Sequence, residues 1–401
     1  MLHHRYALLT TVLLGFTSLA PAAVLTGRVV GPTGTPVSTV DIDVENAATG
    51  VALTTPGDNT NALGVFRFAV PAGTYNIAYL PPFAARLADR KVFNVTVSEP
   101  TTNLGDVRLA RGNLVTGRVV GPGGVAINGV DMDVENSTTG ERIPTHSDHS
   151  DLTGRFSFLV PAGTVDVVVL PPKAARRAAT ILSGVDVTGD ISLGTIQVEQ
   201  GFLVSGQVRQ AAAGVANVDI DVIDTASGEL IPTVEDNTDA GGNYSVVVPA
   251  GTFRFEADPP IGAALSHGFV SNVAVSADRA LNIGLAATPI AAQIGRSGRL
   301  AEAGAPYHFS VTARSTSALP RRIAGRIIGR DPISGVDATL IGPLNFTLPA
   351  RFGPATAGFT YNVPVGFPPG LRNRALELEV EITDARTGRV FDHDITRVWV
   401  P

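Results

Sequence analysis

The sequence of 401 residues contains no cysteine, so no disulfide bond can stabilise the protein and no thiol can act as a nucleophile. Aromatic residues make up only 6% of the chain, with a single tryptophan. Lysine is nearly absent as well, because Lys91 and Lys173 are the only two. The stability of each domain must therefore come from packing, helped by any bound ions.

A strong charge of one sign is also missing. The formal net charge is −6 and is spread along the chain, which argues against nucleic acid and anionic membranes as partners. The basic residues are almost all arginine, and alanine and glycine are abundant. This composition indicates a GC-rich bacterial genome, which is an inference from codon usage.

Catalytic motifs are lacking too. Neither G-x-S-x-G nor G-x-x-x-x-G-K-[ST] occurs, and His267 and His308 lie in unlike contexts without a recurring acid or nucleophile. We therefore expect no enzymatic activity. Sugar binding by stacking would need exposed aromatic rings. We expect three of the candidate rings to lie at core positions of strands, namely Phe66, Phe68 and Tyr75. The single tryptophan, Trp399, ends the last strand.

The chain opens with the layout of a secretory signal peptide. His3, His4 and Arg5 precede an apolar run, and small residues follow at Ala22 and Ala23. Polar residues interrupt this run, so it is a poor match to the roughly 20 apolar residues of a transmembrane anchor. We predict that residues 1–23 are removed by cleavage after Ala22 or Ala23. The mature protein is then expected to be secreted, periplasmic or associated with the cell surface, without membrane insertion.

A repeated segment organises most of the remaining chain. Its acidic residues, glycines and prolines recur in matching places in Val40 to Thr74, Val130 to Thr164 and Val218 to Thr252. Short strand-like runs alternate with turn signals, such as the Val-Pro-Ala-Gly-Thr segments, and no window has a convincing helical period. The pattern predicts an all-β fold of tandem β-sandwiches.

We place the domain boundaries where the repeat begins and ends. The predicted domains after the signal peptide are residues 24–112, 113–201, 202–288 and 289–401. The last domain lies outside the repeat but is again rich in strand-like segments. In its final hairpin, aliphatic residues from Leu376 to Ile382 alternate with Glu377, Glu379 and Glu381, so we expect these three carboxylates to lie in solvent.

The repeats resemble the carboxypeptidase regulatory-like domain, a transthyretin-like (prealbumin-like) sandwich of seven strands that is related to Cna B-type surface repeats. The matching segments are TGRVV, PVSTVDIDV, GVFRF, the Gly73-Thr-Tyr75 hairpin and the closing Leu104 to Leu109. In the last domain, YNVPVGFPPG and the hairpin after it resemble the end of bacterial immunoglobulin-like modules. The resemblance implies three transthyretin-like sandwiches followed by an immunoglobulin-like one.

The same resemblance implies a role without catalysis. Such domains act mostly as spacers, folding aids or adhesive modules. Many Cna B-type repeats form an internal isopeptide bond, which needs a lysine in an early strand. Lys91 lies late in the first repeat, Lys173 lies in a loop, and the third repeat has no lysine. An internal isopeptide bond is therefore excluded in the third repeat and not expected in the others.

The recurring acids are the candidates for ligand binding. Asp41 and Asp43 alternate with aliphatic residues, so both carboxylates should leave one face of a strand, about 7 Å apart. Asp58 follows 17 residues after Asp41, with Asn61 close behind. Like charges held together are costly unless a cation neutralises them, so we predict a calcium site in each repeat. The equivalent ligands in the other copies are Asp131, Asp133, Asp148 and Asp151, and Asp219, Asp221, Asp236 and Asp239.

Other interpretations of these acids stay open. A half-exposed strand can carry such a pair without a ligand, and Asp and Asn stabilise turns through bonds to the backbone. Arg86 or Arg176 could instead neutralise the acids. In the second repeat, His146 and His149 could ligate a transition metal, or they could simply belong to a solvated loop.

The sequence therefore predicts an exported noncatalytic protein that acts as a scaffold, spacer or adhesion element. Its partner, a protein or a polysaccharide surface, is not identified by the sequence. The alternative is a calcium- or carbohydrate-binding protein that uses the acidic loops of the repeats. No cofactor is established by the sequence, and calcium is the one that the acidic residues favour.

Overall fold

The computed structural model describes residues 22–400 apart from 48–49, 297–300, 302–303 and 364–373. Most of the predicted signal peptide, and most of the YNVPVGFPPG segment, lie outside the described residues. The chain divides into two compact units, Met1–Ala110 and Arg111–Pro401, which are taken here one at a time. The only helices in the described ranges are four 3-10 turns of three residues each, none of which could cross a membrane.

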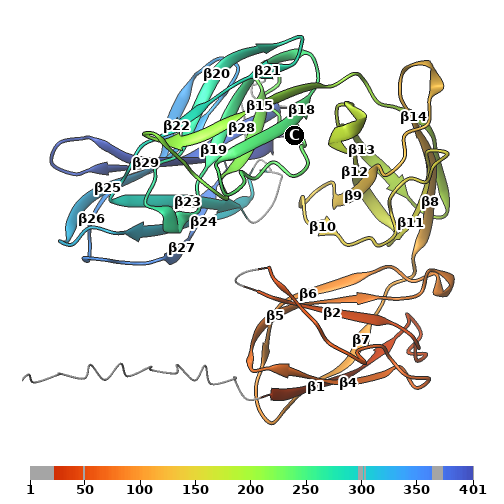
Figure 1. The fold of residues 1–401 in the computed structure, drawn as a ribbon. Helices are drawn as coiled ribbons and strands as arrows, with labels where there is room; N and C mark the ends of the chain where they lie inside the picture. Colours follow the sequence, from red (N-terminus) through yellow and green to blue (C-terminus); the bar gives the residue numbers. More distant parts are fainter. Residues whose placement is uncertain (1–21, 48–49, 297–300, 302–303, 364–373, 401) are drawn as a thin grey trace, which may run out of the picture. The chain divides into compact units, whose positions relative to one another are not determined.

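The first unit is a β-sandwich of two mainly antiparallel sheets (Figure 1). One sheet has the order β4-β1-β7 and the other β3-β2-β5-β6. The first strand runs antiparallel to β4 and parallel to the last strand, β7. The strands are β1 (Ala22–Val30), β2 (Asp41–Asn46), β3 (Ala52–Leu53), β4 (Val65–Pro71), β5 (Gly73–Leu80), β6 (Arg90–Val97) and β7 (Thr101–Arg108).

The second unit begins with the same arrangement. Its first two sheets have the orders β11-β8-β14 and β10-β9-β12-β13, and β8 again pairs parallel with the closing strand. The strands are β8 (Asn113–Val120), β9 (Asp131–Asn136), β10 (Arg142–Ile143), β11 (Arg155–Val160), β12 (Gly163–Leu170), β13 (Thr180–Val187) and β14 (Ile191–Gln197).

A third pair of sheets follows, and it differs from the first two in several strands. Its closing strand is split into two short pieces, β21 and β22, which both pair parallel with β15. The short strand β16 joins the same sheet. The strands are β15 (Phe202–Gln210), β16 (Ala213–Gly214), β17 (Asp219–Asp224), β18 (Asn243–Val248), β19 (Gly251–Asp258), β20 (Gly268–Val275), β21 (Arg279–Ala280) and β22 (Ile283–Leu285).

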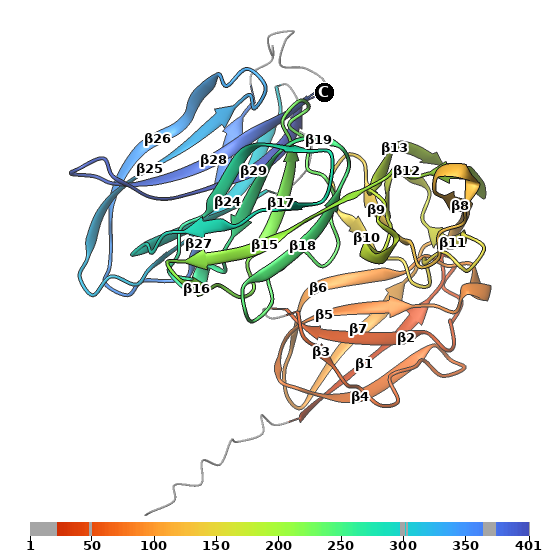
Figure 2. The ribbon, with the colours of Figure 1, turned by 45° about the horizontal axis from the view of Figure 1, so that its top comes forward.

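The last sandwich has longer strands and a different topology. Its sheets have the orders β23-β24-β27 and β26-β25-β28-β29, and all of the pairings are antiparallel. Figure 2 shows it beside the third sandwich. The strands are β23 (Ile290–Arg296), β24 (Pro306–Ser315), β25 (Arg321–Arg330), β26 (Asp337–Leu348), β27 (Ala355–Asn362), β28 (Arg374–Asp384) and β29 (Val390–Val400). The predicted all-β fold of tandem sandwiches is confirmed.

The repeated sequence features have structural causes. Alternation in β2 buries Ile42 and Val44 in the core and leaves Asp41 and Asp43 outside. Gly64 has φ +73°, and a Cβ built on it would lie 2.5 Å from the carbonyl oxygen of Val29. Both the positive φ and this close approach require glycine.

One expectation about the last sandwich is wrong. Glu377 and Glu379 were expected in solvent, but they are 1% and 3% exposed, and Glu381 is only partly exposed. The aliphatic face of β28 does face the core of this sandwich. On the opposite face, Glu377 is covered because Arg254 of the third sandwich pairs with it. Glu379 is covered by Arg330 and His393 of its own sheet, and sequence alternation reveals neither kind of partner.

Candidate functional site

The acids predicted to bind calcium fall into two sets. In the first sandwich, Asp41, Asp43 and Asp58 face one another, since the charges of Asp41 and Asp58 both help raise the pKa of Asp43, after the larger effect of its burial. Asp58 also accepts a hydrogen bond of 2.5 Å from Thr55. Equivalent threonine bonds reach Asp148 (2.5 Å) and Asp236 (2.6 Å). Three of the four predicted ligands of each repeat therefore lie together.

The fourth predicted ligand has another role. Asn61 Oδ1 accepts hydrogen bonds from the backbone N–H groups of Leu63 (2.9 Å) and Val65 (3.0 Å). Asp151 and Asp239 make the same pair of backbone contacts in their own loops. These side chains close the turn before β4, β11 and β18. The turn interpretation thus accounts for the bonds that Asn61, Asp151 and Asp239 make.

The surroundings of the three acids differ between copies. In the second sandwich Arg142 forms an ion pair with Asp133, and His149 lies 3.2 Å from Asp148 and 3.8 Å from Asp131. Arg176, one of the two arginines considered as an alternative partner for these acids, instead pairs with Asp278 at 2.6 Å. The three acidic sites therefore have different charged neighbours, although the acids occupy matching positions in the repeats.

In the third sandwich one of the acids has a strongly raised pKa. Burial, followed by the charge of Asp219, raises the pKa of Asp221 to about 7. The pKa of Asp219 is also raised, by burial and then by Asp236. Arg397 of the last sandwich acts in the opposite direction on Asp221. Neighbouring groups of the last sandwich therefore contribute to the electrostatics of this copy.

A second cluster of charged residues, absent from our predictions, joins the third and last sandwiches. We call it the charged junction: Arg254, Glu256, Asp258, His267, Glu377, Asp392, Asp394 and Arg397. Its first half is a square of ion pairs. Arg254 pairs with Glu256 (2.7 Å) and with Glu377, and Arg397 pairs with the same two acids at 3.0 and 3.6 Å. All four side chains are 15% exposed or less.

The second half of the charged junction is centred on His267. Its Nδ1 lies 3.1 Å from Asp392 Oδ1, and its Nε2 lies 3.6 Å from Asp394 Oδ1. The backbone N–H groups of Ala292 and Ile294 donate to the two aspartates at 2.9 and 2.7 Å. These bonds tie β29 to β23 within the last sandwich and to the residue before β20.

The pKa values of the second half are strongly shifted. Burial acts to lower the pKa of His267, but the hydrogen bond and charge of Asp392, with Asp394, outweigh it and raise the pKa to about 9. Burial raises the pKa of Asp258 to about 8, although His267 partly opposes this. The group thus holds more carboxylates than cations. These residues belong to no repeated motif. The sequence feature that could have revealed them is that the strand GTFRFEAD departs from its counterparts in the other two repeats.

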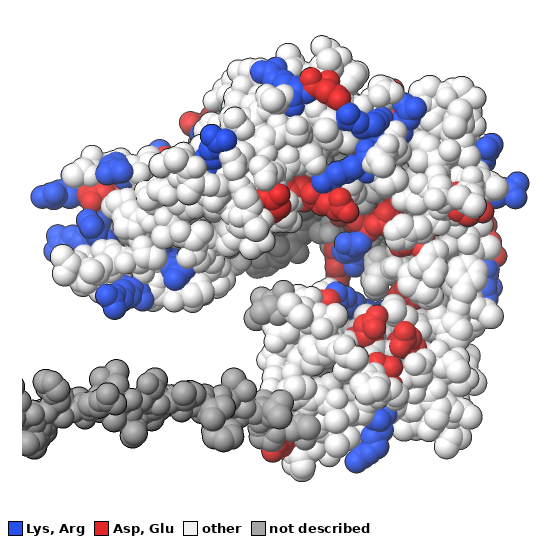
Figure 3. Space-filling model, in the orientation of Figure 1, with Lys and Arg blue, Asp and Glu red and all other residues white. Residues whose placement is uncertain are grey.

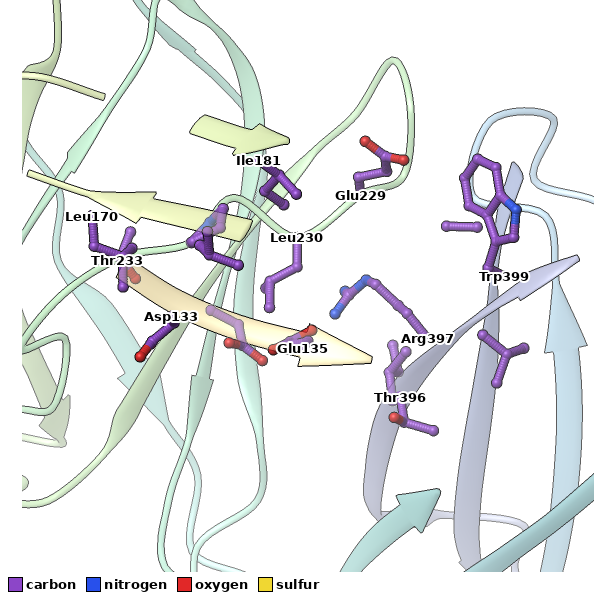
Figure 4. Close-up of a pocket in the computed structure, with 16 residues that line it drawn as sticks. Asp133, Glu135, Leu170, Ile181, Glu229, Leu230, Thr233, Thr396, Arg397 and Trp399 are labelled. Atoms are coloured by element: carbon purple, nitrogen blue, oxygen red, sulfur yellow. The ribbon is translucent and has the colours of Figure 1, made fainter. Parts of the chain in front are cut away.

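A pocket of about 410 Å³ lies in the second unit, next to the charged junction (Figure 4). In Figure 4, Arg397 reaches from β29 toward the side that carries Glu135 and Leu230. Two of the charged lining residues have ion-pair partners, Arg142 for Asp133 and Glu256 for Arg397. Thr233 also lines the pocket, and its hydroxyl donates a hydrogen bond of 2.6 Å to Asp236.

The surface agrees with the modest net charge. On the face drawn in Figure 3, basic and acidic side chains are interspersed and no broad field of one sign is visible. The aromatic residues Phe66, Phe68 and Tyr75 are buried at 1%, 6% and 4% exposure. They form part of the core, as predicted, and offer no stacking surface for a sugar.

Comparisons with known proteins give distant structural likenesses alone. No known family profile matches the sequence, and no curated protein matches it. Among solved structures, the chain is similar to the Bacillus anthracis TIE protein (12% identity, 66% of this chain and 50% of that one, TM-score 0.20). It is also similar to BcpA, the major pilin subunit of Bacillus cereus (8%, 66% and 99%, TM-score 0.18), and to a DUF3823 family protein from Parabacteroides merdae (11%, 49% and 98%, TM-score 0.21).

The chain spans about half the length of the TIE protein. With TM-scores this low, the likenesses carry no argument about function. The fold assignment rests on the strand pairing described above.

Proposed function

We propose that this chain is an exported, noncatalytic spacer or scaffold made of four sandwich domains, with boundaries at residues 24–112, 113–201, 202–288 and 289–401. In this proposal the first three are transthyretin-like repeats and the fourth is immunoglobulin-like. The protein would work outside the cytoplasm and hold a protein or polysaccharide partner at a distance from its point of attachment.

The observation that carries this proposal is the charged junction. It uses buried ion pairs to fix one sandwich to the next, which a binding module with a single site would not require. The stretches between successive sandwiches of the second unit are also short, at residues 198–201 and 286–289. Contacts such as Lys173 Nζ to the carbonyl of Glu235 (2.7 Å) link the second and third sandwiches. These two joints should resist bending, as a spacer requires.

Export is tested by fractionating cells that produce the full-length chain and sequencing the N-terminus of the product. We expect a product in the extracytoplasmic fraction that begins at Ala23. Ala23 is fully buried in β1 and pairs with Val70, so cleavage after Ala22 retains it. An intact chain that starts at Met1 and stays in the cytoplasm would contradict the proposal.

Calcium binding is a second candidate, supported by the three acids that face one another in each repeat. We infer ligands at Asp41, Asp43 and Asp58, at Asp131, Asp133 and Asp148, and at Asp219, Asp221 and Asp236. The hard oxygen ligands suit calcium. Asn61, Asp151 and Asp239 were expected to complete the sites, and we now assign them to the turns.

Calorimetric titration of calcium into chelator-treated protein tests this candidate. A variant with Asp58→Asn, Asp148→Asn and Asp236→Asn should lose the heat of binding. The matched control, Asp151→Asn with Asp239→Asn, should keep it, because the first repeat already has asparagine at that position. An absence of heat from the parent protein would refute calcium binding. Loss of heat in the control would show that Asp151 and Asp239 are ligands after all.

A further inference from the structure

Three side chains of the charged junction converge in a way that the ion pairs do not explain. Asp258 ends β19, His267 precedes β20, and Asp394 lies in β29. Each offers a ligand atom, and these atoms all lie within 4.8 Å of one another. A cavity of about 10 Å³ is lined by the same three residues, which is about the space that one water-sized probe occupies.

One ring nitrogen of this group has no hydrogen-bond partner. The His267 side chain is 8% exposed, and its Nε2 is buried without a hydrogen bond. The other nitrogen, Nδ1, lies 3.1 Å from Asp392 Oδ1. A histidine whose Nδ1–H donates a hydrogen bond to a carboxylate presents the lone pair of Nε2 to the opposite side, and metal-binding histidines are commonly oriented in this way.

The distances suit a metal ion. His267 Nε2 and Asp394 Oδ1 are 3.6 Å apart, while two ligands at the roughly 2.0–2.1 Å bonds of tetrahedral zinc lie about 3.3 Å from each other. The carboxylates also outnumber the cations. Arg254 and Arg397 are taken up by Glu256 and Glu377, so His267 alone faces Asp258, Asp392 and Asp394.

The residues involved are peculiar to the third sandwich. The strands β5, β12 and β19 match residue for residue, and their last positions are Leu80, Leu170 and Asp258. Four residues after each following 3-10 turn come Asp89, Ala179 and His267. The fold therefore does not need an acid followed by a histidine here, and both occur only in the sandwich that meets the last domain.

We propose that Asp258, His267 and Asp394 bind one divalent transition-metal ion, such as zinc, that fastens the third sandwich to the last. His267 binds through Nε2, the two aspartates bind through carboxylate oxygens, and Asp392 positions the imidazole. One nitrogen and two carboxylate ligands are within the usual set for zinc. Two of the ligands come from the third sandwich and one from the last, so the ion links the two domains directly.

The test is a calorimetric titration of zinc chloride into the full-length, chelator-treated protein. Both parent and variants carry His149→Ala, because Asp131, Asp148 and His149 form a second group with ligand spacing. We expect one zinc ion per parent chain. His267→Ala should weaken binding by more than about 100-fold, and Asp392→Asn by about 10–100-fold, the usual cost of losing an outer-shell partner.

Asp258→Leu keeps the test decisive if His267→Ala fails to fold, because leucine is the residue that both other repeats carry at this position. This variant should fold, as followed by circular dichroism, and should bind zinc more than about tenfold more weakly. In the parent, zinc should also raise the melting temperature in proportion to occupancy. No heat from the parent, or equal affinity in the parent and Asp258→Leu, would show that His267 serves only as an ion-pair partner.

Discussion

Gly64 shows how a single residue fixes the repeated turn. Its φ of +73° and the 2.5 Å approach of a built Cβ to Val29 O both oppose a side chain. Gly57 also has a positive φ, +76°, but nothing lies within 4 Å of its Cβ position. We expect Gly57→Ala to destabilise the first unit by about 1 kcal/mol and Gly64→Ala to cost distinctly more. Urea denaturation of the two variants gives the comparison, and equal costs would contradict the steric argument.

Glu377 provides the second prediction at this scale. It is fully buried between Arg254 and Arg397. Removing one partner of a buried ion pair leaves uncompensated charge, so Glu377→Ala should cost about 3–5 kcal/mol. Arg176→Ala breaks the exposed pair with Asp278 and should cost at most about 1 kcal/mol. Both changes lie in the second unit, and chemical denaturation compares them directly; a small effect of Glu377→Ala would show that water reaches the charged junction.

Single residues also mark the limit of the sequence argument. The aspartate pairs were placed correctly on the outer face of their strands, since alternation with a period of two determines which side chains enter a core. The role of Asn61 was not resolved, because a ligand and a turn cap need the same side-chain oxygen. The structure distinguishes the two roles, because Asn61 Oδ1 accepts hydrogen bonds from two backbone N–H groups of the turn.

At the scale of elements, strand patterns predicted the sheets but not what covers them. The alternation in β28 correctly directs its aliphatic residues to the core. It also predicted that Glu377 and Glu379 face solvent, which is wrong because Arg254 of β19 pairs with Glu377, while Arg330 and His393 of the same sheet pair with Glu379. The departure of β19 from the other repeats, GTFRFEAD against GTYNIAYL and GTVDVVVL, was the only sequence sign of this contact.

The buried titratable side chains on and beside these strands make the free energy of unfolding of the second unit depend on pH. The pKa of His267 is raised from 6.5 in the unfolded chain to about 9 in the folded protein. Its charge therefore stabilises the fold fully below pH 6.5, and this contribution is lost as the pH rises to about 9. The pKa values of Asp258 and Asp221 are raised to about 8 and about 7 in the folded protein. Ionising these two groups therefore also destabilises the fold as the pH rises from 4 to 8. We expect the metal-free second unit to lose stability steadily as the pH rises from 6.5 to 9.

Thermal melts across this range test the pH dependence. In His267→Gln the loss of stability between pH 8 and 9 should disappear, because the titrating imidazole is gone and Asp258 and Asp221 titrate at lower pH. Stability that rises with pH in the parent would contradict the shifts of all three groups. Saturating zinc should also reduce the pH dependence if the proposed site is correct, because bound metal excludes protons from its ligands.

For the whole molecule, the division into two units predicts two separate unfolding events. Residues 22–110 have their own core, while the charged junction belongs to residues 111–401. Differential scanning calorimetry should resolve two transitions. Gly64→Ala should lower the temperature of one, and Glu377→Ala that of the other. A single transition that both substitutions shift would show that the units unfold together.

The parallel pairing of first and last strands has a consequence for the timing of folding. In the first sandwich β1 lies between β4 and β7, so its sheet is complete only when Thr101–Arg108 is available. Contacts this distant in the chain form slowly. In the proposed export, a chain that crosses the membrane with its N-terminus first therefore stays incompletely folded until nearly a whole repeat has emerged. This delay suits transport through a channel that admits only unfolded polypeptide, and it lets each repeat fold after its predecessor has finished.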